Sequence, residues 1–429
     1  MDKAQNPAER PDVRANAERS GQSRDERIAI TGVGMTTCLG EGARECWKQI
    51  QRGVSGLGRI TRFDTGDYPI SGGGEAPRLP ERSGDGPEEI LRLERTCQEA
   101  LDDARDACGP PADDGRMALV VGSSLAGSST GEAFFRSYLE RGPSGADYAR
   151  LEGYYMEASL ERLARRFGIR GPSVLVSNAC AAGGSSIARG ASLIESGRAD
   201  RVLCAGYDPL SIFTFAGFGS LMALTPTAVR PFSRTRDGML LGDGYACLVL
   251  ERSRDVHRRG STPRAFLSGR GESTDSHHLT HPHPEGSGAA LAMRRALARS
   301  CLAPEAIGYV NCHGTATRPN DSAEGKALRA VFGARLETLP VSSSKPFFGH
   351  TLGGAGTVEA VVTILALENQ FLPPTLNLDE VDPELGKMDL VRVGREASFE
   401  HAMSNNFGFG GSNVSLVFSR AEPSAGAEP

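Results

Sequence analysis

The chain has few lysines and no long hydrophobic stretch. Only five of its 48 basic residues are lysines, so a lysine inside a motif is informative; they are Lys3, Lys48, Lys326, Lys345 and Lys387. No run of about 18 apolar residues occurs, and the sequence therefore predicts no membrane-spanning helix. The first residues are polar and contain no apolar signal segment, which leads us to expect a cytoplasmic protein. A net charge of −5 offers no basic surface of the kind that binds nucleic acid.

The nine cysteines are odd in number, scattered, and never spaced as C-x-x-C. In a large chain this pattern indicates free thiols rather than a disulfide framework or a zinc site. With 39% hydrophobic and 24% charged residues, the composition is that of a globular protein with an ample core. The 429 residues suffice for two or three average domains or for one large unit in two parts.

The chain divides into a polar extension and two similar halves. Residues 1–26 are charged and lack periodicity, which predicts a disordered extension. Beyond them, short apolar runs alternate with amphipathic segments, which predicts an α/β protein with mainly parallel sheets. The order of predicted elements in residues 27–260 recurs in residues 264–420, and residues 421–429 form a predicted flexible tail. We therefore expect two duplicated halves.

Superposing the two halves relates two polar motifs. When Ser177 is aligned with Ser342, Cys180 falls opposite Lys345, so both turns would face a shared pseudo-two-fold axis. The glycine- and phenylalanine-rich stretch 214–224 is predicted to be a loop.

A predicted strand-to-helix turn surrounds Cys180. The apolar run from Ser173 to Ser177 predicts a buried strand, and the small residues after Ala181 lead into a segment with helical periodicity. Unpaired N–H groups at a helix N-terminus carry partial positive charge and would stabilise a thiolate there. The alternative is a buried structural cysteine, since free cysteine is among the most buried residue types.

Two histidines lie in glycine-bounded loops just after predicted strands. His313 follows a β-rich run that begins at Tyr309, and His350 lies at the glycine-rich entrance of the apolar helix TVEAVVTILALEN. A single histidine in such a place is usually structural. Two of them, together with Cys180 at its turn, predict a Cys-His-His catalytic site.

Four motifs in a fixed order carry a family resemblance: VSNACAAG, HGTATRPND, SSSKPFFGHTLGGAG and NNFGFGGSN. From about Arg27 to Phe418 the chain resembles the β-ketoacyl-acyl carrier protein synthases, most closely synthase II and its relatives in polyketide pathways. The resemblance implies a thiolase-like fold, a five-layered αβαβα arrangement that commonly forms dimers. It also implies acyl carrier protein as a partner and no cofactor, because substrates arrive on the carrier's phosphopantetheine arm.

The resemblance assigns roles by matched position. Cys180 would accept the acyl chain, while His313 and His350 would promote loss of CO₂ from a malonyl thioester and stabilise the enolate. Lys345 would hold the electrostatics and geometry around His313. Carbon–carbon bond formation needs both an activated acyl ester and a carbanion equivalent. The carbanion equivalent is the enolate, and stabilising it would give the second histidine a role.

The resemblance also assigns roles to residues other than Cys180, His313, His350 and Lys345. Phe409, between glycines, would act as a gate to the acyl pocket, and its backbone N–H would pair with that of Cys180 as an oxyanion hole. The other positions are Thr315, Thr317 and Thr280 for the phosphopantetheine arm, Phe218 and Leu125 for the acyl pocket, and Asp321 and Glu324 for the network around Lys345. For the two carboxylates, a place in the first turn of a helix is an equal alternative.

The segment HHLTHPHP contains His277, His278, His281 and His283 and invites a metal interpretation. Its prolines prevent a helical i, i+4 pair, and the resembling family needs no metal, so we expect no metal site.

One departure from the best-known fatty-acid members concerns carrier docking. Met222 stands where many elongating synthases have a basic residue, although an acidic carrier needs a local basic patch on an acidic enzyme. The candidates for such a patch are Arg59, Arg62, Arg136 and Arg141. Together with the different small residues around Cys180 and the N-terminal extension, this departure favours a polyketide or polyene pathway over housekeeping fatty-acid elongation.

Two other functions remain open beside decarboxylative condensation. One is a non-catalytic subunit that shapes the chain-length tunnel of a heterodimer, although such subunits usually lack the nucleophile that Cys180 provides. The other is a thiolase acting on coenzyme A esters, which would need a second catalytic cysteine near the C-terminus, and none follows Cys312. The sequence does not decide between a homodimer and a heterodimer.

Overall fold

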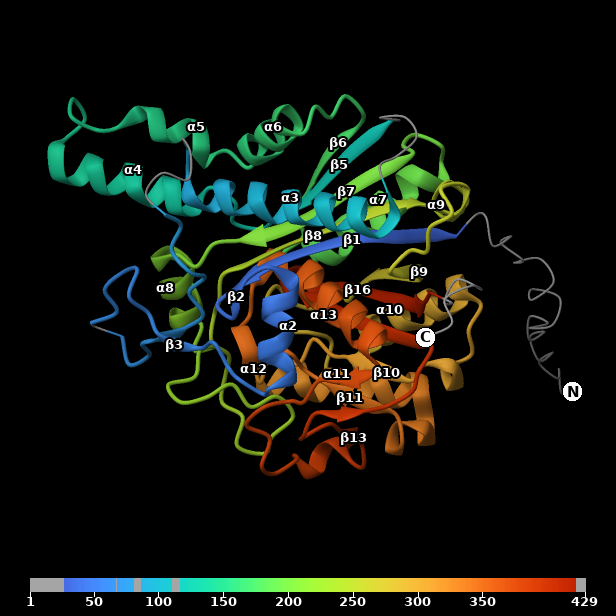
Figure 1. Ribbon diagram of the computed structural model, residues 1–429. Coiled ribbons are helices and arrows are strands. Elements are labelled where there is room, and N and C mark those ends of the chain that lie inside the picture. The colour runs from blue at the N-terminus through green and yellow to red at the C-terminus, as the bar shows by residue number, and fades with distance from the viewer. Residues whose placement is uncertain (1–26, 67, 81–85, 110–115, 422–429) are drawn as a thin grey trace, which may run out of the picture.

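The computed structural model of this protein describes residues 27–66, 68–80, 86–109 and 116–421. The predicted extension, residues 1–26, lies outside them, as does the predicted tail apart from Ala421. The described chain is built on one large mixed sheet with helices on both sides of it (Figure 1).

The first half contributes five strands to this sheet: β1 (Ile28–Thr37), β5 (Met117–Gly122), β6 (Ser173–Val176), β7 (Arg201–Asp208) and β8 (Gly244–Arg252). They lie in the order β1-β8-β7-β5-β6. β5 pairs in parallel with β6 and β7, whereas β8 pairs antiparallel with β7 and β1. β1, β5, β7 and β8 are buried along nearly their whole length, as expected for strands covered on both faces. β6 was predicted to be a buried strand, but it is only half-buried because it lies at the edge of the sheet.

The second half repeats this pattern with β9 (Ala265–Thr274), β10 (Tyr309–Asn311), β11 (Pro340–Ser342), β15 (His401–Gly408) and β16 (Ser412–Arg420). Their order is β9-β16-β15-β10-β11, and each pair has the same direction as its counterpart in the first half. β1 and β9 pair antiparallel and join the halves. The topology confirms the predicted α/β fold built from two duplicated halves. The prediction of mainly parallel sheets is wrong, because the central strands β7, β8, β1, β9, β16 and β15 pair antiparallel and only the outer strands pair in parallel.

Short strands extend this framework. β2 (Gly40–Glu41) pairs with β1, and β13 (Asp389–Leu390) pairs with β11 at the edge. Two small separate sheets are formed by β3 (Gly58–Arg59) with β4 (Gly72–Gly73), and by β12 (Phe371–Leu372) with β14 (Arg395–Glu396).

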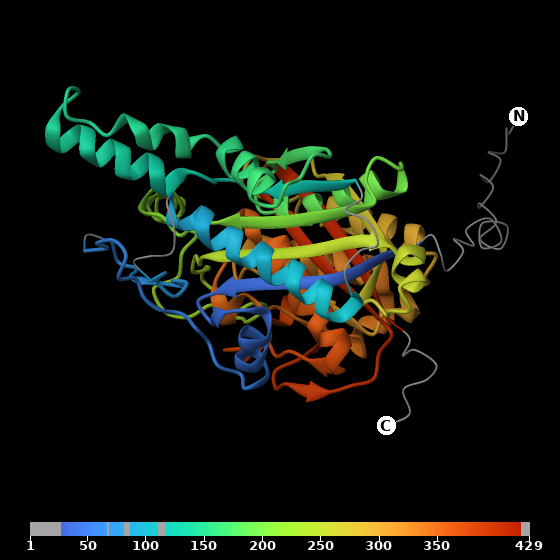
Figure 2. The ribbon, with the colours of Figure 1, turned by 45° about the horizontal axis from the view of Figure 1, so that its top comes forward.

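Helices complete the layers that Figures 1 and 2 show. α3 (Glu88–Cys108) packs on the outer face of the first half, and α10 (Ser287–Ser300) with α11 (Arg318–Phe332) on that of the second. α7 (Ala182–Glu195) and α13 (Ala355–Asn369) lie between the two halves and contact strands of both. The result is the αβαβα succession expected for a thiolase-like fold. The other helices include α2 (Ala43–Gln51), α6 (Glu157–Arg166), α9 (Ser253–Arg258) and α12 (Lys345–Phe348).

Backbone contact between the two central helices fixes the position of the site. A Cβ atom on Gly356 would lie 2.1 Å from the backbone nitrogen of Gly184, and one on Gly183 would lie 2.7 Å from that of Thr357. Only glycine allows so close an approach. The start of α7, just after Cys180, is therefore held against the start of α13.

One predicted loop is a helix. The stretch 214–224 was expected to be a loop, but α8 (Ile212–Ser220) covers most of it. The Ser211 side chain caps this helix by accepting the N–H of Thr214 at 3.2 Å, and Phe215 anchors it in the core. A good cap and an anchoring aromatic residue outweigh the low helix propensity of Gly217 and Gly219.

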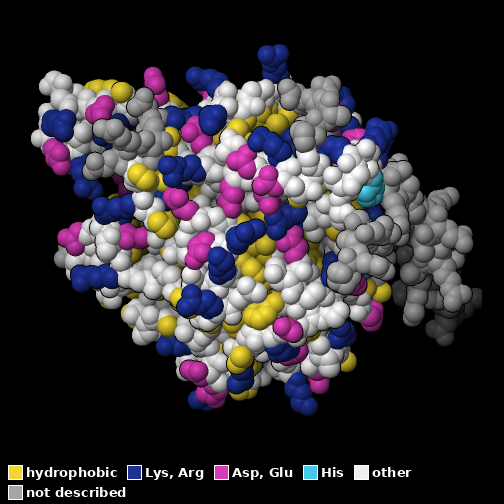
Figure 3. Space-filling model, viewed as in Figure 1, with side chains coloured by type: hydrophobic (Ala, Val, Ile, Leu, Met, Phe, Trp, Pro, Cys, Tyr) yellow, Lys and Arg dark blue, Asp and Glu magenta, His cyan; other side chains and the backbone are white. Residues whose placement is uncertain are grey.

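An arm formed by α4 (Ser128–Arg141) and α5 (Leu151–Tyr154) projects from the body in both ribbon views (Figures 1 and 2). It carries several exposed large apolar side chains, namely Phe135, Tyr138, Leu139, Tyr148, Tyr154 and Tyr155. Elsewhere, the face in Figure 3 shows Lys and Arg side chains interspersed with Asp and Glu. In the part of the chain that the structure describes, no helix is both long and apolar enough to cross a membrane.

Candidate active site

Cys180 lies on a sharp turn between β6 and α7. Ala179, immediately before it, has a φ of 54°, a left-handed conformation that is unusual for alanine and marks a strained turn. The side chain of Cys180 is only 6% exposed. It faces a cavity of about 460 Å³ that leads to the surface.

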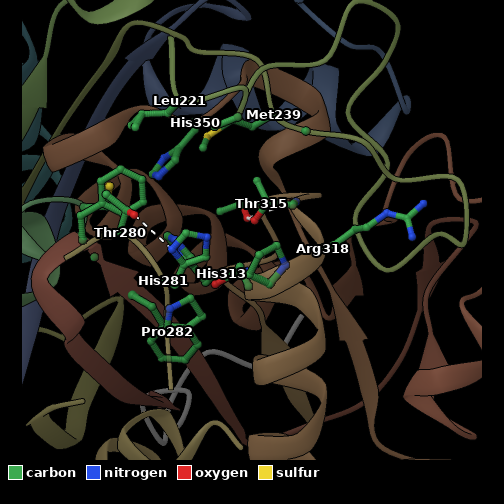
Figure 4. A pocket seen from close by; sticks show the side chains of 18 of the residues that line it. Leu221, Met239, Thr280, His281, Pro282, His313, Thr315, Arg318 and His350 are labelled. Carbon is green, nitrogen blue, oxygen red and sulfur yellow. Dashed lines mark hydrogen bonds between the residues drawn. The ribbon is translucent and has the colours of Figure 1, made fainter. Parts of the chain in front are cut away.

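This cavity brings together most of the residues predicted from sequence (Figure 4). Those that line it are Cys180, Phe218, Thr280, His313, Thr315, Thr317, His350 and Phe409. Leu125 does not line it but packs in the same apolar cluster as Cys180. The remaining predicted residues, Lys345, Asp321 and Glu324, are completely buried and stand behind the cavity wall.

The loop after β10 positions His313. Its backbone N–H and that of Gly314 each donate to the Glu324 carboxylate at 2.8 Å. Asp321 accepts the N–H groups of Phe232 at 2.8 Å and Ala316 at 3.2 Å. Both carboxylates therefore brace the histidine loop. Asp321 also lies in the first turn of α11, so its two predicted placements coincide. Glu324 lies beyond that turn, so the first-turn alternative is wrong for it.

Lys345 connects His313 to a buried carboxylate that the sequence analysis missed. Its Nζ atom lies 3.3 Å from Nδ1 of His313 and donates to Oε1 of Glu359. Oε2 of Glu359 accepts the Asn406 side-chain amide at 2.6 Å. Neither Lys345 nor Glu359 has any exposed surface, so each offsets the other's buried charge.

These contacts fix the tautomers of both imidazoles. A lysine ammonium can only donate, so Nδ1 of His313 accepts and the ring proton is on Nε2. Nδ1 of His350 accepts the backbone N–H of Leu352 at 3.3 Å, with the same consequence. The two rings lie with centroids 5.2 Å apart and an interplanar angle of 82°. Each imidazole thus retains one N–H group that is free to donate.

Both histidines are neutral at physiological pH. Burial lowers the pKa of His313 well below its ordinary value, and the Lys345 charge and His350 add to this effect. Burial and the charge of Lys345 likewise depress the pKa of His350. Two neutral N–H donors are suited to a developing oxyanion, because they bind it without first having to lose or gain a proton.

The environment of the Cys180 thiol raises its pKa, whereas a position at a helix N-terminus would lower it. Burial raises the pKa of Cys180 to about 12, and the nearby carboxylate of Asp208 adds to the rise. The charge of Lys345 and backbone hydrogen bonds from Phe409 and from Cys180 itself oppose it. Desolvation in this cavity thus opposes the stabilisation of a thiolate that the helix N-terminus would provide.

The segment that carries Phe409 abuts the Cys180 turn. A Cβ atom on Gly408 would lie 3.0 Å from the backbone nitrogen of Cys180, so a side chain there would push the two segments apart by a few tenths of an ångström. The Phe409 ring stacks on Phe218 with centroids 5.5 Å apart. Gly410 and Gly411 follow with φ values of 78° and 82°. The ring lies at the cavity wall, against a residue predicted to line the acyl pocket.

The residues predicted to hold the phosphopantetheine arm line the same cavity. Thr315 Oγ1 and Thr317 Oγ1 are 2.9 Å apart, and Thr280 Oγ1 is 3.1 Å from Nδ1 of His281 (Figure 4). His278 and His281 contact each other through their Nδ1 atoms at 3.2 Å. In the described residues, no group of three or more His, Cys, Asp or Glu side chains is arranged to hold a metal ion.

Sequence reasoning also missed Asp208 at the end of β7. Its buried carboxylate accepts the N–H groups of Ser124, Leu125 and Gly353, and the hydroxyl of Ser123. It thereby ties the loop after β5 to the segment that follows His350. Burial raises its pKa to about 6.

The buried role of Glu359 could have been predicted from the sequence. It is an isolated Glu within an apolar helix, and because unpaired charges are rarely buried, it indicated a buried cationic partner.

The chain belongs to the β-ketoacyl synthase family. The family model for the "Beta-ketoacyl synthase, N-terminal domain" matches residues 25–256, and that for the C-terminal domain matches residues 264–379. With a thiolase-like fold and a cysteine beside two histidines, the protein is an acyltransferase of the ketosynthase class.

Individual relatives agree along almost the whole chain. The 3-oxoacyl-[acyl-carrier-protein] synthase 2 of Vibrio cholerae is 34% identical, with 92% of this chain and 99% of that protein covered. The protein of the same name from Synechocystis sp. is 33% identical, with 92% and 98% covered. Among solved structures, the ishigamide ketosynthase/chain length factor is similar with a TM-score of 0.85 at 30% identity, covering 92% of this chain and 99% of that one.

Proposed function

We propose that this protein condenses an acyl chain bound to Cys180 with a malonyl group on acyl carrier protein, with loss of CO₂. The product is a β-ketoacyl-acyl carrier protein that is two carbons longer. The observation that carries the proposal is the common cavity of Cys180, His313 and His350, with both imidazoles neutral and each presenting an Nε2–H group.

In the first step the Cys180 sulfur attacks the thioester carbonyl of an acyl carrier protein. The new S–C bond replaces the bond to the carrier's sulfur, and the proton of the Cys180 thiol passes to that departing thiolate. Because the pKa of Cys180 is raised to about 12, this proton leaves during the attack rather than before it. The backbone N–H groups of Cys180 and Phe409, which both approach the sulfur, would hold the oxyanion.

In the second step a malonyl thioester occupies the cavity with its carbonyl oxygen near both imidazoles. The C–C bond to the carboxylate breaks, CO₂ leaves, and the electron pair forms an enolate whose oxygen accepts the Nε2–H groups of His313 and His350. The enolate carbon then attacks the Cys180 thioester, and the sulfur leaves and regains a proton. Decarboxylation supplies the electron pair, so the proposed reaction needs no resident cofactor.

Acyl carrier protein is the proposed partner because the substrates are thioesters of its phosphopantetheine arm. The hydroxyls of Thr315, Thr317 and Thr280 lie along the cavity in a position to bind that arm.

We further propose a cytoplasmic location, which the nine free cysteines support, since reduced thiols persist in that compartment. The proposed reaction serves either fatty-acid or polyketide elongation. The panel of acyl carrier protein thioesters described below separates these two pathways.

We also propose a dimer with a second copy or a related subunit. Strand β6 ends the sheet, so its outer edge is unpaired within the described part of the chain, and Val174, Leu175 and Val176 are only half-buried. An open apolar edge is a site for strand pairing with another chain. The exposed aromatic side chains of the α4–α5 arm provide a further apolar surface for such a partner.

Intact-protein mass spectrometry tests the proposed reaction. The protein is incubated with a panel of acyl carrier protein thioesters and then with malonyl carrier protein. We expect an acyl mass on Cys180 that disappears in the second stage, with formation of the longer β-ketoacyl product. Cys180→Ala should not load, whereas His313→Ala and His350→Ala should load and fail to condense.

Two outcomes would contradict the proposal. Equal loading of wild type and Cys180→Ala would remove Cys180 as nucleophile. Loading without any condensation by the isolated chain and by its complex with a related subunit would favour a non-catalytic, chain-length-determining role. Loading that appears only with such a subunit would establish an obligate heterodimer.

A further inference from the structure

Exposed apolar side chains lie at the Cys180 cavity and next to it. Leu221 and Met222 line it directly and are 50% and 88% exposed. Leu279 is 79% exposed, and it precedes the lining residue Thr280. The Leu279 carbonyl accepts the N–H of Gly410 at 2.7 Å, which places it beside the Phe409 segment. We call the side chains of Leu221, Met222 and Leu279 the apolar rim.

The rim carries little charge. Arg318 is the one basic residue among the lining residues in the described part of the chain, and the acidic ones are Asp237 and Asp275. Asp275 is engaged with the Asn413 amide and the backbone N–H of His283. Figure 4 shows the Arg318 side chain directed outward, away from His313 and His350. Its charge contributes to the lowered pKa of Asp382, after the larger effect of Arg236.

The basic residues proposed from sequence for carrier docking lie elsewhere. None of them lines the Cys180 cavity. Arg62 is held by the buried carboxylate of Asp243 at 2.7 Å. Arg62, Arg136 and Arg141 line a separate cavity beside α4, together with Arg150 and the acidic residues Glu132, Glu140 and Asp147. The four residues proposed from sequence therefore place no cationic side chain in the lining of the Cys180 cavity.

We propose that acyl carrier protein docks on the apolar rim through an apolar surface of its own, and that Arg318 binds the phosphodiester of its arm. The inference rests on the proposed function, because the buried Cys180 lines this cavity and the carrier's arm would enter it to deliver the acyl chain. A carrier must then contact the rim to deliver its arm. Leu221, Met222 and Leu279 offer it exposed apolar area, and Arg318 offers the phosphodiester the single cation at the cavity wall.

This mode of docking has a distinctive dependence on salt. Screening weakens the attraction between an acidic carrier and a cationic patch, but it leaves apolar contacts intact. We therefore expect KM for the carrier thioester to change less than about threefold between ionic strengths of about 0.05 M and 0.5 M.

Substitution of the rim tests the apolar contact. The ratio of kcat/KM for an acyl-carrier thioester to that for the matching acyl N-acetylcysteamine thioester isolates the carrier's contribution. Met222→Glu and Leu279→Glu should each lower this ratio about tenfold, because they replace an apolar contact with repulsion. Val393→Glu, at a position 76% exposed and outside the cavity lining, is the charge-matched control and should leave the ratio unchanged.

The Arg318 contact is tested with small thioesters that differ only in the phosphate. Wild type should prefer an acyl phosphopantetheine over an acyl pantetheine, and Arg318→Gln should abolish this preference. Arg318→Lys, which retains a cation, should restore part of it.

The outcomes separate this inference from the proposed function. If N-acetylcysteamine thioesters acylate Cys180 but Met222→Glu and Leu279→Glu leave the ratio unchanged, the docking surface is wrong and the reaction stands. A steep rise of KM with salt, together with a fall of the ratio in Arg136→Glu and Arg141→Glu, would likewise overturn the apolar rim. Absence of acylation by every thioester would contradict the proposed function itself.

Discussion

The ammonium nitrogen of Lys345 lies 3.3 Å from Nδ1 of His313, and both side chains are almost completely buried. The lysine thus contributes to the site without touching the cavity, since it is absent from the lining residues. It keeps the proton of His313 on Nε2 and opposes protonation of both imidazoles. Its own charge is offset by Glu359, which makes the pair a single electrostatic unit.

Breaking that unit should cost stability as well as activity. Lys345→Met leaves Glu359 as an unpaired buried carboxylate, and Glu359→Leu leaves the ammonium unpaired. We expect each to lower the free energy of unfolding by about 3–5 kcal/mol, as measured by denaturant titration. The double variant Lys345→Met/Glu359→Leu should recover most of this loss while condensation stays impaired. A double variant no more stable than either single one would show that the charges are not the cause.

The tautomer of His350 leads to a second prediction. His350→Leu removes the Nε2–H donor and should slow malonyl decarboxylation by about 10²–10³-fold. His350→Gln retains an N–H group near that position and should lose less. Release of CO₂ from malonyl carrier protein measures this step, and acyl loading of Cys180 serves as the control for an intact fold. Equal losses in the two variants would argue against an N–H donor at this position.

The raised pKa of the Cys180 thiol predicts its pH dependence. Below a pKa of about 12 the thiolate fraction rises with pH, so alkylation by iodoacetamide should accelerate about tenfold per pH unit between about pH 7 and 9. The rate constant is obtained from the alkylated mass at Cys180, with free N-acetylcysteine as the reference thiol. A rate that is constant over this range would mean that the thiolate is already formed, and that the helix N-terminus outweighs desolvation.

The parts of the site that follow from local patterns were predictable. The turn at Cys180 and the loops at His313 and His350 each combine a strand signal with glycines in one short stretch. The duplicated halves followed from repetition of element order. α8 was missed because glycine content was given more weight than the Ser211 cap and the anchoring Phe215.

The remaining features depend on contacts between distant segments. Glu359 meets Asn406 across 47 positions of sequence, and only the packing of α13 against β15 brings them together. The pKa of Cys180 depends mainly on its burial in the folded protein. No pattern in the sequence around Cys180 reports that desolvation, which is why the helix N-terminus alone suggested the opposite shift.

The contact between Gly408 and the Cys180 turn gives a final prediction. The φ of Gly408 is −123°, which alanine adopts without strain, but its Cβ would lie 3.0–3.1 Å from the nitrogens of Cys180 and Ala181. Gly408→Ala should therefore displace the Phe409 segment and its N–H group, lowering the rate of acyl loading by about 10²-fold. Gly410→Ala is the contrasting variant, because its φ is 78° but nothing lies within 4 Å of the added carbon. Gly410→Ala should cost about 1 kcal/mol of stability through backbone strain and change the rate of acyl loading less than Gly408→Ala.

Acyl-loading reactions that are quenched at set times and analysed by mass spectrometry measure the rates, and thermal unfolding measures the stability. If Gly410→Ala slowed loading as much as Gly408→Ala, the flexibility of the segment, rather than the placement of its N–H group, would control the reaction.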